Sequence, residues 1–66
     1  MGAAIQRLKE FRREKALTKQ QMADKLGYTL SLYEKVEDGR AGVSAKFMHK
    51  FKRVFPDASI DSIFFN

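Results

Sequence analysis

The stretch Thr18–Gly39, TKQQMADKLGYTLSLYEKVEDG, contains two short helical patterns joined by a tight turn at Gly27. Thr18 and Gln21 form a capping box, because each side chain can bond the backbone amide of the other residue. Thr29 can cap the second pattern with its side-chain hydroxyl. Gly27 supplies the positive φ that a short corner between two helices requires. The stretch therefore predicts two closely packed helices, residues 19–26 and 30–37.

Amphipathic patterns on both sides of this stretch predict three further helices. Residues 3–15 place apolar side chains at the i, i+3, i+4 and i+7 spacing of one helix face. Ser44 can cap a helix of residues 45–55, which Pro56 ends, and Ser59 can cap a last short helix of residues 60–64. The apolar side chains expected to pack in the interior are Ala4, Ile5, Leu8, Phe11, Met22, Ala23, Leu26, Tyr33, Val36, Phe47, Met48, Phe51, Val54 and Phe55. No stretch alternates as a strand, so the sequence predicts an all-α, compact five-helix bundle.

The charge of the chain favours a polyanionic partner. Its 66 residues include 13 Lys and Arg and 8 Asp and Glu, a formal net charge of +5. Residues 1–53 carry all 13 basic residues and 6 of the acidic ones, a net charge of +7. Such a concentration of positive charge is typical of proteins that bind nucleic acid.

Several other functional classes find no support in the composition. The chain has no cysteine and a single histidine, His49, so neither a disulfide, a metal site nor a cofactor site is expected. No catalytic set of Ser, His and Asp or of paired carboxylates stands in a supporting motif, so we expect no enzyme. An apolar run of the ~18 residues that span a bilayer is lacking, as is a signal-peptide core. We expect a soluble, cytoplasmic protein without a membrane partner or a small-molecule ligand.

One set of residues in the opening stretch carries a resemblance to a known family. The set comprises Gln20, Met22-Ala23, Leu26-Gly27, Tyr33, Val36-Glu37 and Gly39. It resembles the helix-turn-helix of the phage Cro/cI repressor family, also called Xre-like regulators. The resemblance covers nearly the whole chain and implies a single DNA-binding domain, residues 1–66, with the lambda-repressor-like fold. It further implies an operator-binding transcriptional repressor, associated with the nucleoid of a bacterial host, that forms a weak homodimer on double-stranded DNA.

The resemblance also implies which residues contact DNA, because in this family the second helix of the motif lies in the major groove. The residues implied to contact bases are Leu30, Ser31, Glu34 and Lys35. Those implied to contact phosphates are Lys19, Gln20, Thr29, Arg40 and Lys46. For the two lysines, the alternative is that they lie on a solvated surface without a DNA contact. Arg12 and Glu37 are implied to form a partly buried ion pair, against the alternative of ordinary surface charge.

Two leucines, Leu30 and Leu32, depart from the family pattern. The family often has glutamine, arginine or serine there, whereas leucine can only pack against a thymine methyl or a sugar. An exposed pair of leucines also fits a protein contact, so the alternative function is a protein-interaction module, an antirepressor or complex subunit. Leu32 could instead pack back against neighbouring helices. At the end of the chain, one ring of Phe64-Phe65 is expected to close the bundle and the other to meet a second subunit, unless the terminus is loosely packed.

Overall fold

Four α-helices and one short π-helix form the part of the chain that this computed structural model describes, residues 3–65. They are α1 (Ala3–Glu14), α2 (Lys19–Leu26), α3 (Leu30–Glu37), α4 (Ala45–Val54) and η1 (Asp61–Phe65). The described residues contain no strand, which confirms the predicted all-α fold. Every helix boundary lies within one residue of its expected position. The last helix differs in type, because residues 61–65 adopt the wider π-helical turn.

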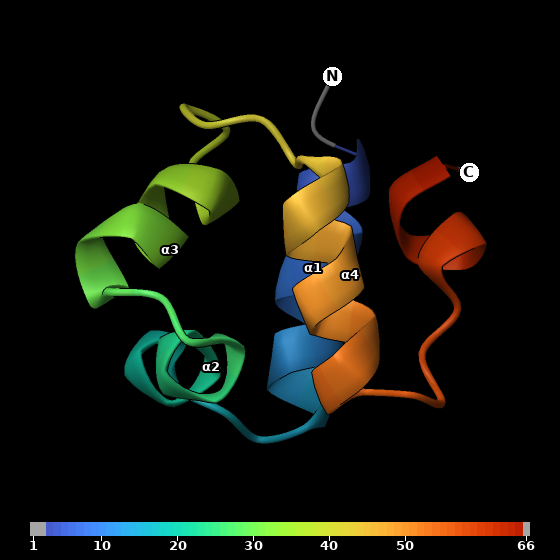
Figure 1. Ribbon diagram of the computed structural model, residues 1–66, viewed down its shortest axis with the longest axis horizontal. Coiled ribbons are helices and arrows are strands. Elements are labelled where there is room, and N and C mark those ends of the chain that lie inside the picture. Colours follow the sequence, from blue (N-terminus) through green and yellow to red (C-terminus); the bar gives the residue numbers. More distant parts are fainter. Residues whose placement is uncertain (1–2, 66) are drawn as a thin grey trace.

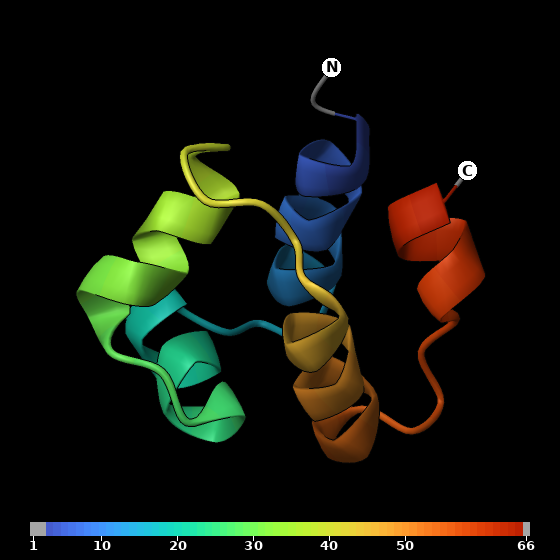
Figure 2. The same ribbon diagram turned by 45° about the horizontal axis from the view of Figure 1, so that its top comes forward.

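The helices are arranged around a central pair, α1 and α4 (Figures 1 and 2). On one side of this pair lie α2 and α3, which pack on each other, α3 also contacting α1 and α2 contacting α4. On the other side η1, which ends the described chain, packs against α1. The outer surface of α3 therefore forms one edge of the molecule, where no other helix covers it (Figure 1).

The buried core draws on every helix. Its apolar members are Leu8, Met22, Ala23, Leu26, Tyr33, Val36, Phe47, Phe51, Ala58 and Ile63. Six side chains expected in the interior are only half-buried instead, namely Ala4, Ile5, Phe11, Met48, Val54 and Phe55. A domain of this size has too much surface for its volume to bury every apolar residue.

Aromatic rings join α4 to its neighbours. The ring centroid of Phe51 lies 5.1 Å from that of Phe11 in α1 and 5.5 Å from that of Phe64 in η1. Phe64 also meets Phe47 edge to face at 6.2 Å, so this ring closes the bundle as expected. The neighbouring Phe65 is 66% exposed.

Three helices end with a residue in the left-handed backbone region. At α2 and α3 this residue is a glycine, Gly27 and Gly39, each with φ of 78°. At α1 it is Ala16, with φ of 57°. The Leu17 amide then donates to the Arg12 carbonyl at 3.1 Å, the bond that defines a Schellman motif. The sequence did not predict this conformation, since alanine has no preference for it.

We expect Ala16→Gly to stabilise the domain by up to about 1 kcal/mol. A Cβ in the left-handed region costs ~1–2 kcal/mol, and the greater freedom of glycine in the unfolded chain offsets part of the gain. The midpoint of urea unfolding should rise with an unchanged m-value. Ala23→Gly, inside α2, serves as the control and should lower the midpoint. A lower midpoint for Ala16→Gly would refute the strain at this helix end.

Candidate nucleic-acid interface

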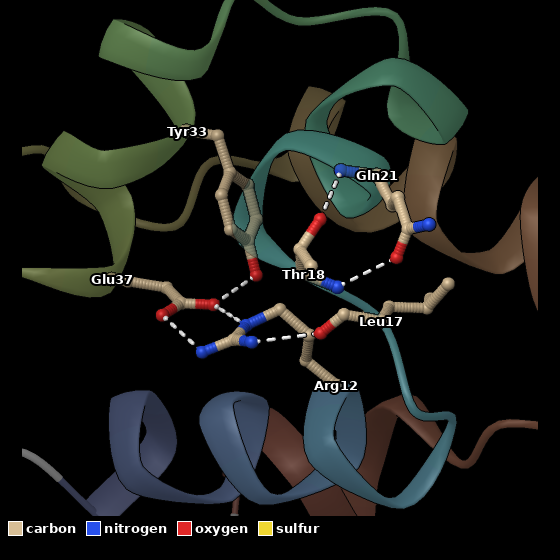
Figure 3. A network of polar contacts seen from close by, with 6 residues as sticks. All are labelled: Arg12, Leu17, Thr18, Gln21, Tyr33 and Glu37. Atoms are coloured by element: carbon tan, nitrogen blue, oxygen red, sulfur yellow. Dashed lines mark hydrogen bonds and ion pairs between the residues drawn. The ribbon is translucent and has the colours of Figure 1, made fainter.

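The N-terminus of α2 is fixed by a reciprocal cap. The Gln21 amide donates to Thr18 Oγ1 at 3.0 Å, and the Thr18 amide donates to Gln21 Oε1 at 2.9 Å (Figure 3). This cap leaves Lys19 and Gln20 in the first turn, where unpaired amides give a helix partial positive charge. The Gln20 side chain is exposed and donates to Asp24 Oδ1 at 2.8 Å, while Lys19 is half-buried. The first turn of α2 thus offers one cation and one amide to an anion.

The turn to α3 is equally well defined. The Leu32 amide donates to Thr29 Oγ1 at 3.1 Å, which leaves the Thr29 hydroxyl proton available to an external acceptor. Because Gly27 lets the chain reverse within a few residues, α3 packs directly on α2. The Thr29 cap and the turn at Gly27 together determine which side of α3 faces the bundle.

The two sides of α3 differ sharply in burial. Tyr33, Val36 and Glu37 are buried and face the bundle. The opposite side exposes Ser31 and Lys35, which lie nearly one turn apart in the same direction. The remaining expected base contacts, Leu30 and Glu34, are half-buried at the margins of this surface.

Leu32 also belongs to the exposed side of α3. Its side chain is 42% exposed, so the alternative in which it packs back against neighbouring helices is wrong. It lies about 90° around the helix axis from the outermost direction, on the flank opposite Glu34. The exposed surface of α3 therefore combines hydroxyl, cationic and aliphatic groups.

A buried polar network holds the inner side of α3 to α1 (Figure 3). Arg12 Nε donates to Glu37 Oε2 at 2.7 Å, and Arg12 Nη2 donates to Glu37 Oε1 at 3.3 Å. The Tyr33 hydroxyl donates to the same Oε2. Arg12 Nη1 donates to the Leu17 carbonyl at 2.8 Å, which joins the start of α2 to the same group. The ion pair expected between Arg12 and Glu37 is present, and its carboxylate is only 1% exposed.

Two members of this network, Arg12 and Tyr33, have a raised pKa and so hold their protons more tightly than usual. The hydrogen bond with Glu37 raises the pKa of Arg12, against the smaller effect of its own burial. Burial, and then the hydrogen bond to Glu37, raises the pKa of Tyr33 well above its ordinary value of 10.0. Arg12 therefore stays charged and Tyr33 stays a neutral donor as the pH rises.

Two expected phosphate contacts border the loop between α3 and α4. Arg40 is exposed and pairs with Asp38 at 3.0 Å, so a neighbouring carboxylate already neutralises part of its charge. Lys46 is exposed in the first turn of α4, which Ser44 caps by accepting from the Phe47 amide at 3.0 Å. Both cations lie beyond the C-terminal end of α3, whereas Lys19 and Gln20 begin α2.

A family model described as a helix-turn-helix domain matches residues 6–55. The chain belongs to this family. Membership supports a DNA-binding regulator, and the family is typically non-enzymatic. The matched residues of this helix-turn-helix domain include all of α2, α3 and α4, whereas η1 lies outside them. Searches of curated proteins and of solved structures gave no match. Within residues 3–65, every helix is too short or too polar to cross a membrane.

Two interactions of the helix-turn-helix domain escaped the sequence analysis. Tyr33 was expected as a core residue only, yet its hydroxyl completes the ion pair; its position four residues before Glu37 was the available signal. The ammonium of Lys50 lies 5.0 Å from the ring centroid of Tyr28, in the turn before α3. No local pattern indicates that contact, because it joins α4 to a distant turn.

Proposed function

We propose that this domain is a sequence-specific regulator of transcription that binds double-stranded DNA, acting as a Cro-like repressor of the phage type. The observation that carries the proposal is the division of α3. Its inner side is locked to the bundle by Glu37 and Tyr33, while its outer side exposes Ser31 and Lys35 at an edge of the molecule. An exposed helix on a rigid base, in a chain with positive charge, fits the major groove of DNA.

Base contacts are assigned to the outer side of α3. Lys35 is placed to donate to guanine O6 and N7, and Ser31 bonds several base edges with little discrimination. Glu34 accepts from cytosine N4, and Leu30 packs against a thymine methyl. Discrimination between sequences therefore rests on few directed hydrogen bonds.

Phosphate contacts are assigned to helix starts and loop cations. Lys19 and Gln20 extend from the first turn of α2, and Thr29 offers its hydroxyl proton at the cap of α3. Arg40 and Lys46 supply the corresponding contacts on the other side. These groups provide most of the affinity, because each neutralised phosphate releases bound counterions.

The regulator acts as one domain, residues 1–66, in the cytoplasm of a bacterial host and in association with its nucleoid. It binds a pseudo-palindromic operator as a weak homodimer that forms on the DNA. The 66% exposure of Phe65, the last residue of η1, supports a second copy, since an exposed ring gains stability when a partner covers it.

Selection of bound duplexes from a random pool, at two salt concentrations, tests the proposal. An enriched palindrome gives both the specificity and the spacing of the half-sites. Binding that weakens with salt but enriches no sequence would leave only electrostatic attraction and would contradict sequence-specific regulation.

We expect Lys19→Gln and Lys35→Gln, combined, to weaken binding to the selected duplex by at least about 10-fold, since each charged contact contributes ~1–3 kcal/mol. The salt slope should also fall by about 0.9 for each phosphate that the variant no longer neutralises. Fluorescence anisotropy at several salt concentrations measures both quantities. The combined variant Arg13→Gln and Lys15→Gln, which removes two exposed cations at the end of α1, is the matched control. Equal losses in the two proteins would show that the assigned surface is wrong.

A second candidate function is a protein-interaction module, an antirepressor or a complex subunit. The 42% exposure of Leu32 favours it, while the half-buried Leu30 lies on the opposite flank of α3. A variant carrying Leu30→Lys and Leu32→Lys separates the two functions. A regulator that binds DNA keeps or gains affinity for duplexes of unselected sequence, whereas a module of this second kind loses its protein partner. If the partner is retained, this candidate fails.

A further inference from the structure

An open pocket of about 320 Å³ lies between the C-terminal halves of α2 and α4. Leu26 and Val54 provide apolar surface, and three cations, Lys25, Lys50 and Arg53, line the rest. Figure 1 shows α2 beside the lower, C-terminal half of α4, the two segments to which the lining residues belong. The exposed side of α3 does not contribute to it. Along α2, Lys25 stands ~9 Å from Lys19, so the pocket is separate from the phosphate contacts proposed at the start of that helix.

The three cations of the pocket have no counter-ion of their own. Within residues 3–65, the ion pairs are those of Arg12 with Glu37 and of Arg40 with Asp38, and neither includes a pocket residue. The one carboxylate at the pocket, Asp24, accepts a hydrogen bond from the Gln20 amide at 2.8 Å. It does not pair with Lys25, Lys50 or Arg53. The pocket therefore keeps an excess of positive charge.

Lys50 is placed at the pocket by specific contacts. Its ammonium lies 5.0 Å from the Tyr28 ring centroid, and this ring stacks on Phe47 with centroids 5.7 Å apart. Gly27 also neighbours this ammonium, since a Cβ added to it would lie 3.9 Å from Lys50 Nζ, an ordinary van der Waals distance. A cation held over an aromatic face loses less freedom when it binds a ligand.

The helix dipoles explain part of this arrangement but not all of it. Arg53 and Lys25 lie in the last turns of α4 and α2, where cations offset the partial charge of about −0.5 at each C-terminus. Lys50 lies before the last turn of α4, so the dipole does not account for it. The three positive charges of the pocket therefore exceed the negative charge of the Asp24 carboxylate and of the two helix C-termini together.

We propose that this pocket binds a phosphate group, carried either by a small phosphorylated molecule or by a nucleic-acid backbone. Arg53 offers a planar pair of donors that matches phosphate oxygens, and Lys25 and Lys50 supply point charges. Because Gly27 begins the turn to α3, a bound phosphate joins α4 to the helix-turn-helix motif at that turn. Binding of a free phosphorylated molecule does not depend on the proposed function, whereas binding of a backbone phosphate rests on it.

Titration of the ¹⁵N-labelled protein with inorganic pyrophosphate, at constant ionic strength, tests the site. We expect saturable shifts of the Gly27, Lys25 and Lys50 amide signals and a rise in Tm with ligand concentration. Lys50→Gln and Arg53→Gln should each weaken binding by at least about 10-fold. Arg13→Gln, which removes the same charge from α1, should bind pyrophosphate as tightly as the unaltered protein.

A second arm distinguishes the two sources of phosphate. If the Gly27 signal still responds to pyrophosphate when a duplex is bound, the pocket takes a free phosphorylated molecule. If the duplex prevents this response, and Arg53→Gln weakens duplex binding while Arg13→Gln does not, the pocket takes a backbone phosphate. The proposal is overturned if pyrophosphate gives no saturable shift and Arg53→Gln leaves duplex binding unchanged, or if Arg13→Gln weakens binding as much as Arg53→Gln. Because the pyrophosphate arm contains no DNA, its failure leaves the proposed regulator untouched.

Discussion

Replacing Glu37 by alanine should destabilise the domain by about 3–5 kcal/mol, because it leaves the buried guanidinium of Arg12 without its carboxylate. The Tyr33 hydroxyl loses its acceptor in the same step. A chain of 66 residues is typically stable by only ~3–10 kcal/mol, so a large part of the population should unfold. Urea unfolding followed by far-UV circular dichroism measures the loss.

Two further variants show whether the burial of the Arg12–Glu37 pair is the reason for the large loss of stability. Asp38→Ala breaks an ion pair whose side chains are 46% and 64% exposed, and it should cost no more than ~1 kcal/mol. A triple variant with Arg12→Leu, Glu37→Leu and Tyr33→Phe removes every polar side chain of the network and should recover most of the lost stability. If Glu37→Ala cost no more than Asp38→Ala, the network would not hold α3 in place.

Phe51→Ala should also destabilise the domain by about 3–5 kcal/mol, the usual cost of deleting a buried phenyl ring. Phe51 is fully buried and meets Phe11, Phe55 and Phe64 at ring-centroid distances of 5.1, 5.2 and 5.5 Å. Its loss opens a cavity where α1, α4 and η1 converge. Thermal and urea unfolding should both move to lower midpoints.

Phe65→Ala is the matched control for this prediction. It deletes the same ring from a side chain that is 66% exposed, so the change in unfolding free energy should stay within about 0.5 kcal/mol. The same variant should weaken cooperative binding to paired half-sites if the second copy covers this ring. Equal losses of stability from Phe51→Ala and Phe65→Ala would mean that the aromatic cluster does not form the core.

The helices were predictable because their signals are local. Thr18, Thr29 and Ser44 each accept from an amide three residues on, and any chain with this spacing can make that bond. The left-handed conformation of Ala16 could not be predicted, since alanine normally continues a helix and only packing imposes the turn. The exposure of Leu32 likewise depends on how α3 sits against its neighbours.

The candidate sites, too, were predictable only where their residues are close together in the sequence. The spacing of Ser31 and Lys35 places them on one side of α3 in any regular helix. The pair of Arg12 and Glu37 was expected only through the family resemblance, because nothing local joins two helices so far apart in the chain. The pocket has no sequence signal at all, since Lys25 and Lys50 meet only once α2 packs against α4.

The one-sided attachment of α3 has a consequence for divergence among relatives. Tyr33, Val36 and Glu37 bind the helix to the bundle, while Ser31 and Lys35 make no contribution to its burial. Substitutions at these two positions should therefore leave the free energy of folding nearly constant, and under the proposed function they would change the preferred target. Under the proposed function, relatives could acquire new targets through single substitutions at these positions, without an intermediate sequence that folds less stably. The same property makes the chain a suitable scaffold for transplanting the outer residues of another regulator.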